Sequence, residues 1–160
     1  MKHRLAILFV LLPLIAGTAA AQARQATDPN TTIRRMNPPT LNKPTGYTHV
    51  VIATGGRTIY IAGQTAVDKD GNLVGRGDFR VQAKQVFENL KAALAASGVG
   101  FGQVVKLNYY VLDMANAPVL RELRTSYLGS ALPASTLVEI KKLARDEFML
   151  EIEAIAVSAQ

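Results

Sequence analysis

The sequence predicts an α+β domain with the element order β-β-α-β-α-β-β and with both helices on one face of the sheet. Two stretches carry apolar residues at helical spacing, between segments rich in β-branched and apolar residues. The chain has 160 residues, of which 49% are hydrophobic and 19% charged, and this composition suits one packed domain. Strands are predicted over residues 47–53, 58–67, 103–112, 136–143 and 148–157.

Residues 1–21 have the composition of a secretory signal peptide. A basic start, Lys2 to Arg4, precedes an apolar run of 11 residues from Leu5 to Ile15, and small residues follow. This run is too short to cross a bilayer, which takes about 20 apolar residues. Cleavage fits after Ala21 or Ala23, with an uncleaved membrane anchor as the alternative. We therefore expect an exported protein, periplasmic or secreted, that keeps no membrane contact after cleavage.

Residues 22–45 are rich in Gln, Thr, Asn and Pro. Prolines interrupt helices and central strands, because they lack the backbone N–H group and fix φ. We interpret this segment as a flexible leader in front of a domain that covers residues 46–160.

The composition excludes several kinds of chemistry. The chain has no Cys, so thiol nucleophiles, thiolate zinc sites and disulfides are all ruled out. Two His residues are too few for a His-rich metal cage. Removal of the signal peptide leaves 16 Lys and Arg against 12 Asp and Glu, a net charge of +4. This mild excess without a basic run argues against nucleic-acid binding.

The first two strands flank Gly55-Gly56, a turn signal that predicts a hairpin between them. A second turn is predicted at residues 68–72. An EF-hand calcium loop is the alternative there, but its twelfth position counted from Asp68 is Phe79 rather than Glu. Ordinary turn chemistry therefore explains this segment.

Both helices have recognisable ends. Asp78 can cap a helix that runs to about Ser97, and Gly98 follows it. Asn116 is the predicted cap of the second helix, which carries Pro118 in its first turn and Gly129 after its end. These signals predict the positions of the two helices that cover the sheet.

The last strand has apolar residues on both of its sides, so both faces of the sheet need cover, and a second subunit is the simplest cover for the face without helices. Glu151 and Glu153 share one of those sides. Two carboxylates this close disfavour joint ionisation, and such a group can exchange protons near neutral pH. The alternative is that each of them pairs with a Lys or an Arg.

Several motifs together resemble the RidA (reactive intermediate deaminase) family, also called the YjgF family. The carboxy-terminal part carries P-A-S-T-L-V-E-I from Pro133 to Ile140 and E-I-E-A-I-A-V from Glu151 to Val157. Earlier segments agree with the family pattern, namely Ile61 to Gln64, Gln82 to Gly98 and Val104 to Asp113. The resemblance covers about residues 45–158.

The resemblance implies a chorismate-mutase-like α+β fold and a homotrimer with small-molecule clefts between its subunits. It also implies chemistry without a metal or an organic cofactor. The reaction would be the hydrolysis of an enamine or imine to a carbonyl compound and ammonia. The alternative is a non-catalytic trimer in the cell envelope, acting as a small-molecule-binding or chaperone-like module.

The resemblance also assigns roles to residues. Glu151 matches the glutamate that positions water for attack on the imine carbon. Ser135 stands where the family has an arginine that binds the substrate carboxylate, and a hydroxyl cannot replace a forked cation. Arg121 or Arg124 is a candidate for that missing charge, and we favour Arg121. The substrate-binding residues implied in this way are Tyr47, Ala62, Gly63, Arg121, Ser135 and Leu137.

Overall fold

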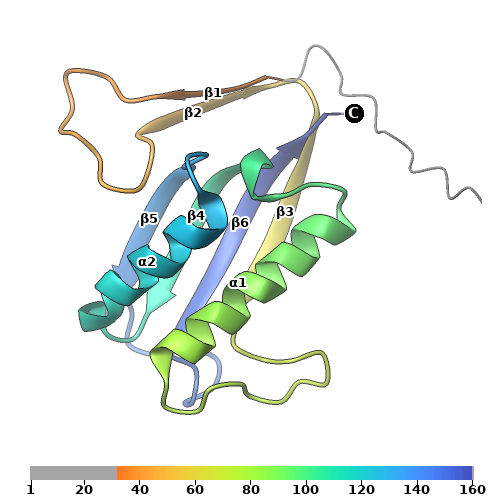
Figure 1. Ribbon diagram of the computed structural model, residues 1–160, viewed down its shortest axis with the longest axis vertical. Helices are drawn as coiled ribbons and strands as arrows, with labels where there is room; N and C mark the ends of the chain where they lie inside the picture. The colour runs from red at the N-terminus through yellow and green to blue at the C-terminus, as the bar shows by residue number, and fades with distance from the viewer. Residues whose placement is uncertain (1–31, 160) are drawn as a thin grey trace, which may run out of the picture.

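The computed structural model describes residues 32–159 (Figure 1). The predicted signal peptide over residues 1–21 lies outside this range. Two short 3-10 turns, Phe101–Gln103 and Met114–Asn116, lie between longer elements. The helices and strands, in chain order, are β1 (Thr32–Met36), β2 (Val50–Thr54), β3 (Arg57–Gln64), α1 (Phe79–Ala96), β4 (Val104–Val111), α2 (Ala117–Leu128), β5 (Ala134–Glu139) and β6 (Leu150–Ser158).

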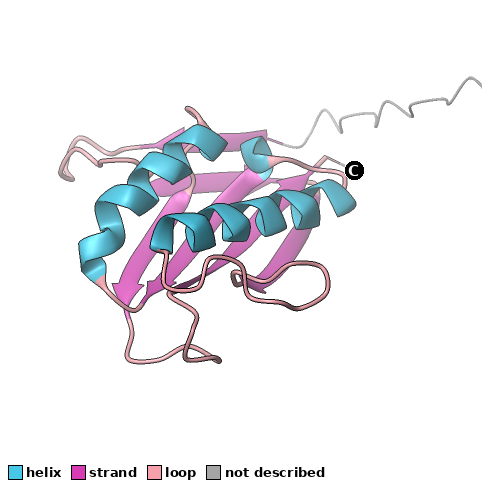
Figure 2. Ribbon diagram, turned by 60° about the horizontal axis from the view of Figure 1, so that its bottom comes forward, coloured by secondary structure: helices cyan, strands magenta, loops and turns pink. Residues whose placement is uncertain are grey.

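The main sheet has four strands in the order β3-β6-β4-β5. β6 is antiparallel to both of its neighbours, whereas β4 and β5 are parallel. Both helices lie on the same face of this sheet, as the two views show (Figures 1 and 2). The predicted α+β class and the one-sided placement of the helices are therefore confirmed. We call the other side of the sheet the open face.

The predicted hairpin between the first two strands is wrong. β2 pairs instead with β1, antiparallel, from Thr32 opposite Thr54 to Met36 opposite Val50, in a separate two-stranded sheet. β3 pairs with β6. The glycines at positions 55 and 56 provide a reversal of the chain, but a reversal does not determine which strand becomes the hydrogen-bonded partner.

β1 also corrects part of the prediction for residues 22–45. This segment was expected to lack regular structure, yet residues 32–36 form a strand. The strand is possible because its residues, T-I-R-R-M, include no proline, and the next proline, Pro38, comes only after its end. The Arg35 guanidinium ties β1 to the main domain by donating from Nη2 to the carbonyls of Gly102, at 2.9 Å, and Val104, at 3.2 Å.

The predicted helix ends are largely confirmed. Asp78 caps α1 by accepting a hydrogen bond from the Val81 backbone N–H, at 3.1 Å. α2 begins after Asn116 and ends before Gly129, whose φ of 54° suits a glycine at the helix end. The Asn116 side chain does not cap the helix, and Asp113 caps the preceding 3-10 turn instead. Local capping chemistry thus places both helices.

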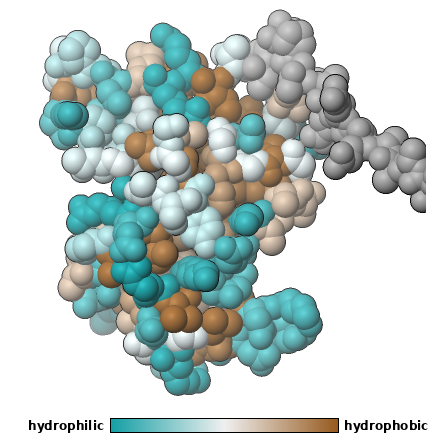
Figure 3. All heavy atoms as spheres, viewed as in Figure 1, coloured by the Kyte–Doolittle hydropathy of each residue, from teal (hydrophilic) through white to brown (hydrophobic). Residues whose placement is uncertain are grey.

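An ion pair joins the two helices on their outer side. Arg80 of α1 donates two hydrogen bonds of 2.8 Å to the two carboxylate oxygens of Glu122 of α2. These hydrogen bonds, with the positive charge of Arg80, hold the pKa of the Glu122 carboxyl below its usual range. On this helix side, hydrophobic residues form small separate patches among hydrophilic ones, a surface that water can cover (Figure 3).

The polar side chain of Gln82 on α1 is completely buried in the core between the helices and the sheet. Its Nε2 donates to the carbonyls of Gly75, at 3.2 Å, and Glu147, at 2.8 Å, while its Oε1 accepts from the Met149 backbone N–H, at 2.9 Å. Gln82 therefore links α1 to the loops that lead into α1 and β6.

Replacing Gln82 by Leu is expected to lower the free energy of unfolding by about 2–4 kcal/mol, because three buried backbone groups would lose their partners. Urea denaturation followed by circular dichroism measures this loss. Lys84→Ala, on the exposed side of the same helix, is the control and should change stability little. Equal stabilities of the Gln82→Leu variant and the native protein would show that the hydrogen bonds of Gln82 contribute nothing net.

Within residues 32–159, neither helix combines the length and apolar character that a membrane crossing requires.

Candidate functional site

The alternation of β6 places two carboxylates on the open face. Leu150, Ile152 and Ala154 point into the core beneath the helices, whereas Glu151 and Glu153 point to the other side and are half-buried. Their neighbours across the sheet are on β4, where Tyr110 lies opposite Glu151 and Asn108 opposite Glu153. The predicted shared face of the two glutamates is thus confirmed.

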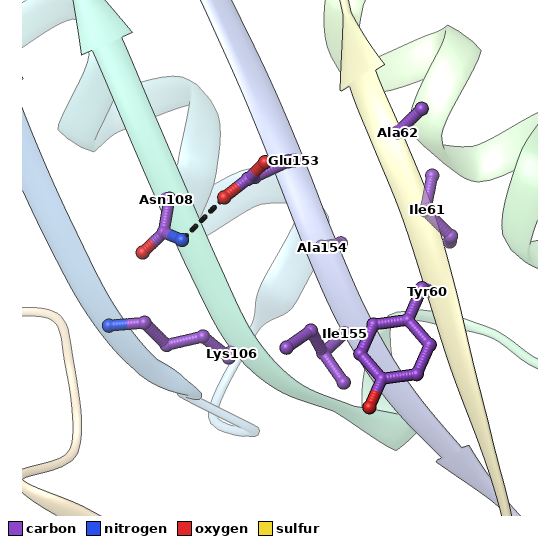
Figure 4. Close-up of a pocket in the computed structure, with 8 residues that line it drawn as sticks. All are labelled: Tyr60, Ile61, Ala62, Lys106, Asn108, Glu153, Ala154 and Ile155. Atoms are coloured by element: carbon purple, nitrogen blue, oxygen red, sulfur yellow. Dashed lines mark hydrogen bonds between the residues drawn. The ribbon is translucent and has the colours of Figure 1, made fainter.

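Glu153 is bound by two neighbouring side chains. Its Oε1 accepts a hydrogen bond of 2.6 Å from Asn108 Nδ2 (Figure 4). The same oxygen accepts one of 3.1 Å from the Tyr110 hydroxyl. The bond to Glu153, together with burial, raises the pKa of the Tyr110 phenol. Glu153 is therefore held as an acceptor within a polar network.

Glu151 is placed differently. Its carboxylate lies directly against the backbone of Gly63 on β3, so close that a Cβ atom at Gly63 would overlap it. Within residues 32–159 it has no hydrogen bond or ion pair from another side chain. The alternative that each glutamate pairs with a Lys or Arg is not found in this part of the chain. The Glu151 carboxylate is left free to contact a bound molecule.

Two adjacent cavities, each of about 370 Å³, open on this face. In the first, Tyr60 and Ile155 provide apolar walls, and Asn108 and Glu153 a polar centre (Figure 4). The second adjoins Glu151, and the nearest cation in its lining, Lys142, pairs with Asp146 at 3.1 Å. Its lining residues are Tyr110, Ile140, Lys142, Leu143, Ala144, Glu151 and Glu153.

Three of the predicted site residues come together on the open face. Gly63 contacts Glu151, and Ala62 lines the cavity beside Glu153. The bulge between Ile61 and Gln64 gives this part of β3 its irregular path along β6. Because Gly63 has no side chain, the carboxylate can approach its backbone.

Ser135 and Leu137 lie on the opposite side of the sheet. The parallel register places Ser135 beside Leu107 and Leu137 beside Tyr109, and both of these β4 residues belong to the core under the helices. Within one chain, Ser135 and Leu137 therefore cannot share a cavity with Glu151. A site that combines Ser135 and Leu137 with Glu151 needs two copies of the chain.

The remaining two predicted residues also lie away from Glu151. Arg121 is on the exposed side of α2, and its side chain has no bonded partner in the part of the chain that the structure describes. Tyr47 lies just before β2, with its ring edge-on to the His49 ring at a centroid distance of 5.1 Å. Its neighbour Gly46 contacts the guanidinium of Arg124.

The sequence interpretation missed Asn108 and Tyr110. The signal was available, because Lys106, Asn108 and Tyr110 alternate with buried residues in a strand that was predicted correctly. Polar residues at every second position of a strand mark one face, and here they mark the face of the two glutamates. Among residues 32–159, no three His, Asp or Glu side chains gather in a way that could hold a metal ion.

Gly63→Ala is expected to move the Glu151 carboxylate without unfolding the protein, because the added methyl group meets the end of a flexible side chain. The melting temperature should stay within a few degrees of the native value, and any activity that depends on Glu151 should fall at least about tenfold. Thermal melting and the activity assay described below measure the two effects. A fully active Gly63→Ala variant would show that this contact does not position Glu151.

The α+β sheet with both helices on one face, which Rid-family structures share, places the protein in the chorismate-mutase-like class. Residues 40–158 match the family model described as Endoribonuclease L-PSP. The chain belongs to this family, to which the RidA and YjgF proteins also belong.

Individual relatives agree with the family assignment. A RutC family protein of Pyrococcus horikoshii is 40% identical over 116 residues, covering 71% of this chain and 89% of the relative. A mouse protein named 2-iminobutanoate/2-iminopropanoate deaminase is 37% identical over 101 residues, covering 63% and 74%. The crystal structure of a Rid family protein of unknown function from Yersinia pestis superimposes with a TM-score of 0.74 at 36% identity, covering 78% and 98%.

Proposed function

We propose that this protein is an exported, cofactor-free hydrolase of imines or enamines that releases ammonia and a carbonyl compound. The observation that carries the proposal is the Glu151 carboxylate, which lies against Gly63 and has no side-chain partner among residues 32–159. The name of the mouse relative, an iminobutanoate and iminopropanoate deaminase, supports this reaction class. The signal-like sequence of residues 1–21 supports export.

The chemistry requires one carboxylate that accepts and then returns a proton. Glu151 takes a proton from water as the oxygen attacks the imine carbon, and the C=N bond becomes a C–N single bond. Glu151 passes this proton to the nitrogen, which gives the neutral carbinolamine. It then takes the proton of the carbinolamine hydroxyl and passes it to the nitrogen as the C=O bond forms and the C–N bond breaks. The products are the carbonyl compound and ammonia, and Glu151 returns to its ionised form. An enamine enters the same path after its carbon is protonated to give the imine.

We also propose that the active assembly is a homotrimer whose sites lie between copies. The open face supports this, because its apolar side chains include Tyr60, 78% exposed, and Val138, 36% exposed. The placement of Ser135 and Leu137 supports it further, since only a neighbouring copy can bring that wall to Glu151.

The second candidate function is a trimeric module that binds a small molecule, or acts as a chaperone, without turnover. The observation in its favour is Ser135, which provides a hydroxyl where the resemblance implies an arginine. A weaker hold on the substrate carboxylate would favour reversible binding without turnover over imine hydrolysis.

The test uses imines made in the assay by an L-amino-acid oxidase with catalase present. Semicarbazide traps the free imine, so a hydrolase lowers the yield of semicarbazone and speeds the release of ammonia. We expect the native protein to do both with imines from small amino acids. No effect with any imine, combined with saturable binding of 2-oxo acids, would contradict the hydrolase and favour the binding module.

A further inference from the structure

Arg124 lies in the middle of the buried side of α2. Leu120 and Leu128, four residues before and after it, are 3% and 5% exposed. Side chains at this spacing lie on one side of a helix, so the Arg124 side chain leaves the helix toward the sheet. A position of this kind is normally apolar, and a cation there needs an acceptor.

The structure supplies no such acceptor within residues 32–159. The Nε atom of Arg124 is buried without a hydrogen-bond partner, and no carboxylate of this range pairs with its guanidinium. The hydroxyl of Tyr109 on β4, a residue only 2% exposed, also lacks a partner. Burial raises the pKa of the Tyr109 phenol, and the positive charge of Arg124 opposes that rise. Two unsatisfied donors thus lie near each other under α2.

A third element closes around the guanidinium. Gly46 has a φ of 80°, and a Cβ atom built on it would overlap the terminal nitrogen of Arg124. Only glycine combines that conformation with so close an approach. The segment that carries Tyr47 is therefore shaped around the Arg124 guanidinium, on the side of the sheet where Ser135 and Leu137 also lie.

We propose that Arg124 and Tyr109 together bind the carboxylate of the ligand. A carboxylate accepts hydrogen bonds from a guanidinium and a phenol at once, which would satisfy both buried donors. Position 135 on β5 is Ser and provides no cation. The positive charge for the ligand carboxylate would then come from Arg124 on α2, on the same side of the sheet, and not from Arg121. The identity of this ligand as a 2-oxo or 2-imino acid rests on the proposed function.

The test is a titration with 2-oxobutanoate, a stable carboxylate probe, followed by calorimetry or by NMR shifts. Arg124→Gln is expected to weaken binding by about 10- to 100-fold, the loss typical of one charge-assisted contact. Arg121→Gln, on the exposed side of the same helix, should keep the native affinity. Butanone, which lacks the carboxylate, should show no difference between the variants. An Arg124→Gln variant with native affinity for 2-oxobutanoate would overturn the proposal.

Two further variants keep the test decisive if Arg124→Gln does not fold. Arg124→Lys retains the positive charge but loses the paired N–H donors of the guanidinium. Tyr109→Phe removes only the hydroxyl. Each variant should therefore give an intermediate loss of affinity. Native affinity in both would overturn the proposal. Glu151→Gln should still bind 2-oxobutanoate. If Arg124 binds 2-oxobutanoate but the protein releases no ammonia from any imine, only the proposed hydrolase function is contradicted. If the Arg124→Gln variant hydrolyses imines at the native rate, only the proposed role of Arg124 is contradicted.

Discussion

Replacing Glu151 by Gln is expected to reduce imine hydrolysis by about 10²- to 10⁴-fold, the range typical of the loss of a general base. Gln keeps the size of the side chain but cannot accept the proton of the attacking water. The fold should be unaffected, because no described side chain depends on the Glu151 carboxylate. The semicarbazide competition assay gives the rate.

Glu153→Gln is the matched comparison, since this residue lies on the same face of the same strand. Its carboxylate is already occupied by Asn108 and Tyr110, so we expect a much smaller loss of activity. Equal losses in both variants would mean that the open face acts through its overall charge. A native rate in Glu151→Gln would remove Glu151 from the mechanism.

The features that the sequence predicted correctly are those determined by neighbouring residues. The alternation of β6 is readable because side chains along a strand alternate between two faces, and this placed Glu151 and Glu153 together. The Asp78 cap needs only the backbone three residues ahead. Both are local properties of the chain.

The features that the sequence did not predict depend on contacts between distant segments. The partner of β2 is β1 rather than β3, because the edge that a strand pairs with depends on the whole sheet. The opposite faces of Ser135 and Glu151 follow from the parallel register of β5 on β4, which no local pattern encodes. The sequence could have shown that Arg124 rather than Arg121 lies on the buried side of α2, since Arg124 comes four residues after Leu120.

Mixed oligomers that contain Glu151→Gln and Arg124→Gln subunits are expected to recover activity that neither variant has alone. In one chain Glu151 lies on the open face, whereas Arg124 reaches the sheet from the helix side. A site that uses both must take them from two copies. Random assembly of the proposed trimer from equal amounts leaves about one quarter of the interfaces with both native side chains. Co-expression of the two variants with different tags, tandem purification and the imine assay measure this recovery.

The control pair is Glu151→Gln with Gly63→Ala. Gly63 positions Glu151 within the same chain. Every subunit of that mixture therefore has either no Glu151 carboxylate or a displaced one, and activity should stay low. Recovery of activity in the first pair but not in the second would mean that the site takes Glu151 from one copy and Arg124 from another. Absence of recovery in the first pair, with mixed oligomers demonstrated by the two tags, would mean that Glu151 and Arg124 do not serve one shared site.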